Sequence, residues 1–287
     1  MNVREEEFKV TTADGIAIAA TVFRPEKDNG KAILMVPASG MKQTYYQNYF
    51  AFLARNGFTT VTFDYRGVGK SLAGDIRKFD AHMHDWGEKD LAGMLDWIKN
   101  NLACKKLFVV TNSVGGQILG LAENCGLIDG AVMIASAHGY YGNWKWPANF
   151  IVKYFWGSFA PNVIRKKGYF TGKKFGLGDD LPPQIALEWA AWCLKPDFLF
   201  GIYPESVTGR YGKMRIPILS YSFDDDWLAN DFRVDKLMAK YSGANITRRH
   251  VAAKKTVRKR IGHTGFFKKE LEGTLWAETL EWLAQIK

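Results

Sequence analysis

The chain has 287 residues, of which 47% are hydrophobic and 24% are charged. This length predicts one large domain or two small ones, and the composition is that of a globular protein, which excludes a disordered or collagen-like chain. The net charge of +10 suits an anionic partner, but no nucleic-acid-binding module is recognisable, so we expect no nucleic-acid partner.

Strand and helix patterns alternate along the chain. Two β-rich runs, Phe8–Ala13 and Ile16–Phe23, flank Asp14-Gly15, a strong hairpin signal. Continuous apolar or β-branched runs predict buried strands at Lys31–Val36, Phe58–Phe63, Lys106–Thr111, Gly130–Ala135, Ile216–Tyr221 and Ile246–Val251. Apolar residues at helical spacing predict helices at Tyr46–Leu53, Leu91–Ile98, Val114–Glu123 and Leu275–Leu283. This alternation predicts an α/β fold with a mostly parallel sheet covered by helices on both faces, and with the hairpin as an antiparallel edge.

The alternation stops between His138 and Phe200, a stretch that holds five of the ten tryptophans. Its pattern is helical but is interrupted by prolines. We interpret residues 138–207 as a helical cap inserted into a core formed by residues 1–137 and 208–287. Most of its aromatic side chains would form the core of the cap, and the others would line an apolar ligand pocket.

No apolar run approaches the 18 residues of a membrane-spanning helix. The first residues, Met1–Glu7, are acidic and no apolar stretch follows them, so we expect no secretory signal and a cytoplasmic location. The three cysteines lack the spacing of metal ligands, and His82 and His84 have no second cluster nearby in the sequence. We therefore expect no metal site and no cofactor.

The sharpest chemical signal is Thr111–Gly116, where a predicted strand ends and a predicted helix begins. A serine at such a turn projects its hydroxyl from the sheet edge, and the helix N-terminus offers N–H groups to an oxyanion. Ser113 is therefore a candidate nucleophile, although Thr111 is larger than the residue that usually stands two places before such a serine. A plain turn is the alternative interpretation.

Two further loops carry the groups that would complete a Ser-His-Asp arrangement. Three acids, Asp224–Asp226, follow one predicted strand, and His263 lies between glycines after the last one. Ser-His-Asp chemistry built on such a serine turn runs in the order serine, acid, histidine along the chain. Each of the three groups follows a predicted strand, and open α/β sheets place their sites at this edge. His263 would take the proton of Ser113, and one of the acids would hold the imidazole.

The sequence resembles the α/β-hydrolase superfamily, near its esterase, monoglyceride lipase and serine aminopeptidase branches. The resemblance covers nearly the whole chain and is carried by Val36–Met41, Asp64–Ser71, the Ser113 turn, Asp224–Asp226 and Gly262–Phe267. The sequence departs from the usual pattern at Thr111-Asn112, where the family has Gly-His, and in the loop after Val36, which lacks the usual His.

The resemblance implies that Ser113 is the nucleophile and His263 the base. It favours Asp225 as the acid, because an apolar segment follows it at the usual distance, with Asp224 as the runner-up. The oxyanion donors implied are the backbone N–H groups of Val114 and Met41; a shift of register would replace Met41 by Gly40 or Ser39.

These features predict a serine hydrolase that cleaves a carboxylic ester or thioester of a small or acyl-chain substrate through an acyl-enzyme. Acyl transfer and aminopeptidase action would use the same triad and stay open. The alternative is a catalytically degenerate α/β-hydrolase-fold module that binds an apolar ligand or an anionic partner, because one fold hosts many functions.

Overall fold

The computed structural model describes residues 2–286 and contains one eight-stranded sheet with the strand order β1-β2-β4-β3-β5-β6-β7-β8. The strands are β1 (Val3–Thr11), β2 (Ala17–Pro25), β3 (Lys31–Val36), β4 (Thr59–Phe63), β5 (Lys106–Asn112), β6 (Gly130–Ile134), β7 (Pro217–Phe223) and β8 (Asn245–Val251). β1 and β2 pair antiparallel, as do β2 and β4, and every other pair is parallel. The predicted α/β fold with an antiparallel edge is thus confirmed.

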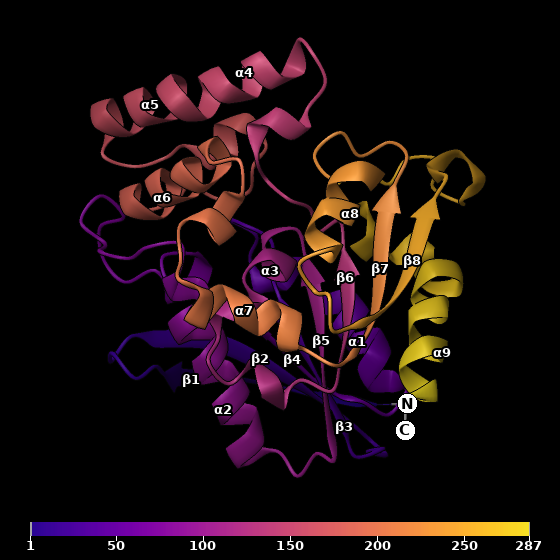
Figure 1. The fold of residues 1–287 in the computed structure, drawn as a ribbon. Helices are drawn as coiled ribbons and strands as arrows, with labels where there is room; N and C mark the ends of the chain where they lie inside the picture. The colour runs from indigo at the N-terminus through magenta and orange to yellow at the C-terminus, as the bar shows by residue number, and fades with distance from the viewer. Residues whose placement is uncertain (1, 287) are drawn as a thin grey trace.

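Nine α-helices surround the sheet in the described part of the chain (Figure 1). They are α1 (Gln47–Arg55), α2 (Ala92–Asn101), α3 (Val114–Gln117), α4 (Ala148–Tyr154), α5 (Ala160–Lys167), α6 (Pro183–Leu194), α7 (Glu205–Lys213), α8 (Asp231–Met238) and α9 (Ala277–Gln285). α1 and α9 cover one face of the sheet and are joined by a 2.7 Å hydrogen bond between Tyr49 and Thr279. α2, α3, α7 and α8 cover the other face. Both faces are therefore buried, which explains the continuous apolar runs of the central strands.

One helix is shorter than its sequence pattern predicts. The expected helix Val114–Glu123 ends as α3 at Gln117, and a short 3₁₀ turn follows at Leu119–Leu121. The Tyr211 hydroxyl donates to the Gln117 carbonyl at 2.5 Å, and a Cβ on Gly120 would lie 2.3 Å from the Tyr211 ring. Packing against α7 therefore takes the acceptor that a continuing helix would use.

The segment after β4 holds the hairpin turn against the core. Arg66 is buried and binds the carboxylates of Asp90 at 2.6 Å and Asp14, in the hairpin turn, at 2.7 Å. Its guanidinium holds the pKa of Asp14 far below the usual range. This pairing joins the antiparallel edge to the loop that leads into α2.

The parallel strands all point toward the end of the sheet on which α4, α5 and α6 lie (Figure 1). These helices belong to the segment predicted as a cap, which we call the inserted segment (residues 138–207). Its position above the carboxyl ends of the strands puts it over the edge where such sheets carry their sites. In the part of the chain that the structure describes, no helix combines the length and apolar character needed to cross a membrane.

Candidate active site

Ser113 lies at the sharp turn between β5 and α3 in a strained conformation. Its φ of 51° and ψ of −114° are rare for a residue with a side chain, and such strain costs about 1–3 kcal/mol and gathers at functional sites. Gly115 makes the turn sterically possible, because a Cβ there would lie 2.1 Å from the Val36 carbonyl oxygen. The sequence therefore builds a turn that exposes the serine hydroxyl at the sheet edge.

His263 contacts the serine directly. Its Nε2 lies 2.8 Å from Ser113 Oγ, although the two residues are 150 positions apart in the chain. The imidazole is carried by the loop that follows β8, and the side-chain amide of Asn112 donates to the His263 carbonyl at 3.4 Å. The structure thus brings the predicted nucleophile and base within hydrogen-bond distance.

The acid beside His263 is Asp226 and not Asp225. Asp226 Oδ2 lies 2.8 Å from His263 Nδ1, and its carboxylate is buried. The exposed Asp225 instead accepts the backbone N–H groups of Ile261 and Gly262, at 2.8 and 2.9 Å. This geometry corrects the choice of Asp225 made from the sequence.

The runner-up, Asp224, is also placed elsewhere: it accepts the Ala253 N–H at 2.8 Å. The three adjacent carboxylates therefore hold three different segments of the site. A turn closed by the Asp226 N–H and the Phe223 carbonyl, 3.2 Å apart, directs the third one inward. No sequence signal separates three consecutive acids, because the direction of each side chain depends on that turn.

Arg233 on α8 places a buried positive charge near the site. It is buried, stacks at 3.8 Å on the Trp144 ring and donates to the Trp227 carbonyl. Burial lowers the pKa of Arg233 to about 10, and the charge of Asp226 opposes this shift. The guanidinium therefore stays positive at neutral pH.

The oxyanion donor predicted from the loop after β3 needs a correction. The Met41 N–H donates to the Ala38 carbonyl at 3.2 Å and closes a turn in which Gly40 has a φ of 66°. Within residues 2–286, the N–H groups of Val114, Ser39 and Gly40 have no hydrogen-bond acceptor. Of the two free groups in the loop, Ser39 lines the cavity that holds Ser113 and Gly40 does not. The geometry therefore favours the Ser39 alternative over Met41 and Gly40.

The larger residue at the start of the serine turn is accommodated by its neighbours. Thr111 is buried, and its hydroxyl lies 3.1 Å from the Ser136 hydroxyl. Gly116 leaves room for this pair, because a Cβ there would lie 2.4 Å from Ser136 Oγ. The departure at Thr111 is therefore compatible with the strained serine turn.

A cavity of about 430 Å³ opens above Ser113 and His263. The inserted segment supplies its aromatic and aliphatic walls, which include Trp144, Ile151, Val152, Phe155, Trp156, Phe175 and Trp189. Among the described residues, those lining the cavity include no Asp, Glu, Lys or Arg. His138, at the start of the inserted segment, lines the same cavity.

Three arginines in the last forty residues of the chain form ion pairs. Arg248 binds Asp231 at 2.6 Å, and Arg249 binds Glu278 at the same distance. Arg258 binds Glu270 at 2.5 Å. The positive charge of these three side chains is therefore balanced locally.

Comparisons with known proteins agree with this fold. The family model described as serine aminopeptidase, S33, matches residues 27–171, just over half of the chain. An α/β hydrolase, GrgF from Penicillium sp. sh18, has a TM-score of 0.67 at 15% identity over 100% of this chain and 99% of that one. The Pyrococcus furiosus esterase Pf2001 has a TM-score of 0.62 at 15% identity over 99% of this chain and 93% of that one. No curated protein matches the sequence.

Proposed function

We propose that this chain, which belongs to the serine aminopeptidase (S33) family of α/β hydrolases, is a serine hydrolase that cleaves uncharged carboxylic esters or thioesters. One observation carries the proposal: Ser113, His263 and Asp226 form a continuous hydrogen-bonded chain with two 2.8 Å links. Such a chain activates a hydroxyl that is otherwise a weak nucleophile.

In the proposed reaction, Ser113 Oγ attacks the carbonyl carbon while its proton passes to His263 Nε2. Asp226 keeps the Nδ1 proton in place and stabilises the imidazolium that forms. The N–H groups of Val114 and Ser39 stabilise the oxyanion, and removing one such donor typically costs about 100-fold to 1,000-fold in rate. His263 then gives the proton to the leaving alcohol or thiol, and water releases the acid from the acyl-enzyme by the same steps.

The cavity supports an uncharged acyl group as the bound part of the substrate. Its walls are aromatic and aliphatic, and they carry no side-chain carboxylate among the described residues. A buried ammonium group needs such a partner, because an isolated charge in an apolar site is very costly. The lining of the cavity therefore favours an ester or thioester as the substrate. It argues against a peptide with a free amino terminus, which is the substrate that the family name, serine aminopeptidase, suggests.

The test is labelling of the purified protein with a fluorophosphonate probe. We expect labelling of the natural chain and none of Ser113→Ala. Ser158→Ala, which makes the same change at an exposed position of the inserted segment, should label like the natural chain. A panel of neutral esters and thioesters, compared with aminoacyl anilides of similar size, then tests the substrate class.

A folded protein that reacts neither with this probe nor with a small sulfonyl fluoride would overturn the proposal and leave the non-catalytic binding module. Faster turnover of aminoacyl anilides than of neutral esters would overturn the assignment of the substrate class alone.

A further inference from the structure

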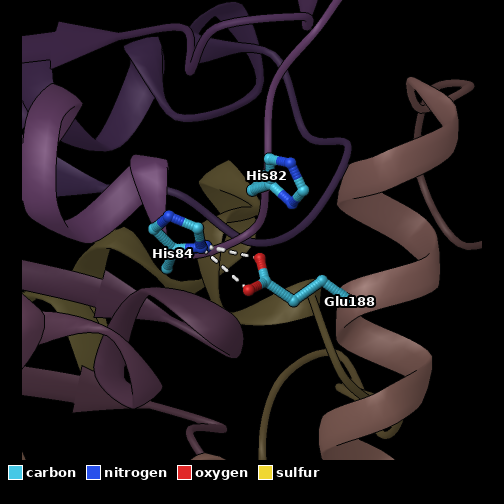
Figure 2. Close-up of side chains that lie close together, drawn as sticks. All are labelled: His82, His84 and Glu188. Atoms are coloured by element: carbon cyan, nitrogen blue, oxygen red, sulfur yellow. Dashed lines mark hydrogen bonds and ion pairs between the residues drawn. The ribbon is translucent and has the colours of Figure 1, made fainter. Parts of the chain in front are cut away.

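A cluster of potential metal ligands lies where the inserted segment meets the core (Figure 2). His82 and His84 belong to the loop between β4 and α2, and Glu188 lies on α6, more than 100 residues later. The third ligand of the cluster does not come from the sequence around the two histidines. The fold supplies it from the inserted segment.

The three side chains point toward one another (Figure 2), and one potential ligand atom from each lies within 4.8 Å of the others. His84 Nδ1 is 2.8 Å from Glu188 Oε1, and the backbone N–H of His84 donates to Glu188 Oε2 at 3.0 Å. All three side chains are half-buried. Among residues 2–286, no other group of three His, Cys, Asp or Glu side chains has this arrangement.

We propose that His82, His84 and Glu188 bind one divalent transition-metal ion, with Zn²⁺ as the best match. Two imidazoles and one carboxylate form a ligand set that Zn²⁺ accepts, and water takes the fourth tetrahedral position. Bonds of about 2.0–2.1 Å place tetrahedral ligand atoms about 3.3 Å apart. The 2.8 Å contact between His84 and Glu188 would therefore open only slightly to admit the ion.

The groups around the cluster support this assignment. Asp85 Oδ1 lies 3.6 Å from His84 Nε2, the ring nitrogen that faces away from Glu188. The Tyr203 hydroxyl donates to Glu188 Oε1 at 2.8 Å. A carboxylate behind a ligating histidine and a hydrogen bond to a ligating carboxylate are the usual outer partners of a protein metal site.

Metal binding would replace a proton by the metal ion at this position. The ion replaces the proton that His84 Nδ1 shares with Glu188, and that proton is released to solvent. Without metal, His84 and Glu188 remain joined by their 2.8 Å hydrogen bond.

The proposed ion would tie α6 to the core. Glu188 adjoins Trp189, which lines the cavity above Ser113. A metal bond to Glu188 therefore restrains the helix that forms one wall of the cavity. This site does not depend on the proposed hydrolase chemistry, because none of its ligands contacts Ser113 or His263.

The experiment uses the full chain, stripped of metal with a chelator and titrated with Zn²⁺ by calorimetry and with Co²⁺ by visible absorption. We expect one equivalent of Zn²⁺, a tetrahedral Co²⁺ spectrum, and a Tm that rises with Zn²⁺ concentration. His82→Asn and Glu188→Gln should each weaken binding by at least about 10-fold. So should Tyr203→Phe, which removes the hydroxyl that donates to Glu188 and that accepts the Trp192 indole N–H at 3.2 Å. His250→Asn alters an exposed histidine on β8 and should bind like the natural chain.

Absence of stoichiometric binding at micromolar Zn²⁺ would overturn the proposal. So would unchanged affinity in both His82→Asn and Glu188→Gln, since the ion would then sit elsewhere. If either variant fails to fold, the Zn²⁺ affinity of Tyr203→Phe decides between the outcomes, because this change keeps the aromatic ring. The Tm of this variant without metal shows whether its fold is intact.

Discussion

Oδ2 of Asp226 lies 2.8 Å from Nδ1 of His263. The neighbouring carboxylate, Asp225, holds the backbone of the histidine loop instead. Two adjacent acids therefore separate into an acid that contacts the imidazole and an acid that supports its loop. The two roles can be distinguished by replacing each carboxylate with an amide, because one change should affect turnover and the other the stability of the loop.

Asp226→Asn should lower kcat by about 10⁴-fold, because an amide favours the wrong imidazole tautomer and cannot stabilise the imidazolium. Asp225→Asn is the matched control: it should leave kcat within about 10-fold and act mainly on the stability of the loop. Ester turnover and thermal unfolding of both variants check this. Equal kinetic effects in the two variants would contradict the assignment of Asp226.

Gly115→Ala should destabilise the protein by about 3 kcal/mol or more, because overpacking against backbone cannot be relieved by a side-chain movement. The added methyl group would lie 2.1 Å from the Val36 carbonyl oxygen. Gly126→Ala adds the same group where no atom lies within 4 Å and should leave stability unchanged or slightly higher. Chemical denaturation measures both; a stable, fully active Gly115→Ala protein would argue against the strained turn.

Trp189→Leu should move the preference of the enzyme toward longer acyl chains. The indole forms part of the cavity wall, and its ring centre lies 4.8 Å from that of Trp156 at a tilt of 56°. A smaller side chain therefore lengthens the space available. A difference of one or two methylenes in an apolar pocket is worth about 10-fold to 200-fold in kcat/KM. Trp282→Leu, on α9, is the control, and an ester series of graded length is the measurement. An unchanged length profile in Trp189→Leu would mean that the acyl group binds elsewhere.

His138 should make the protein less stable as the pH falls. Burial lowers the pKa of His138 from its ordinary value of 6.5 to about 4, and the nearby charge of Lys240 adds to this effect. Between these two values the unfolded chain binds more protons than the folded one, so stability is present above pH 6.5 and is lost toward pH 4. The loss amounts to at most about 3 kcal/mol.

The check is the free energy of unfolding from pH 4 to pH 8 in the natural chain and in His138→Asn. The asparagine keeps an acceptor for Asn143, which now bonds to His138 Nδ1 at 3.0 Å. The variant should be less sensitive to pH in this window. Parallel curves for the two proteins would show that His138 does not titrate as its burial implies.

The sequence determined the sheet and the first two members of the proposed triad. The apolar runs in β3 and β5 predict strands because both faces of each are buried, so the middle of each strand is continuously apolar. Ser113 and His263 could be chosen because each stands alone in its loop: no competing serine follows β5, and no second histidine follows β8 in that loop.

Tertiary structure alone decided which of three adjacent acids faces His263, which N–H groups of the oxyanion loop remain free, and where α3 ends. Each depends on a contact between distant segments, such as the Tyr211 hydroxyl that takes the Gln117 carbonyl. The same holds for the His82, His84 and Glu188 cluster, whose third ligand comes from α6. Local patterns encode burial and turn chemistry, whereas the direction of a side chain at a loop is set by the segments that pack against it.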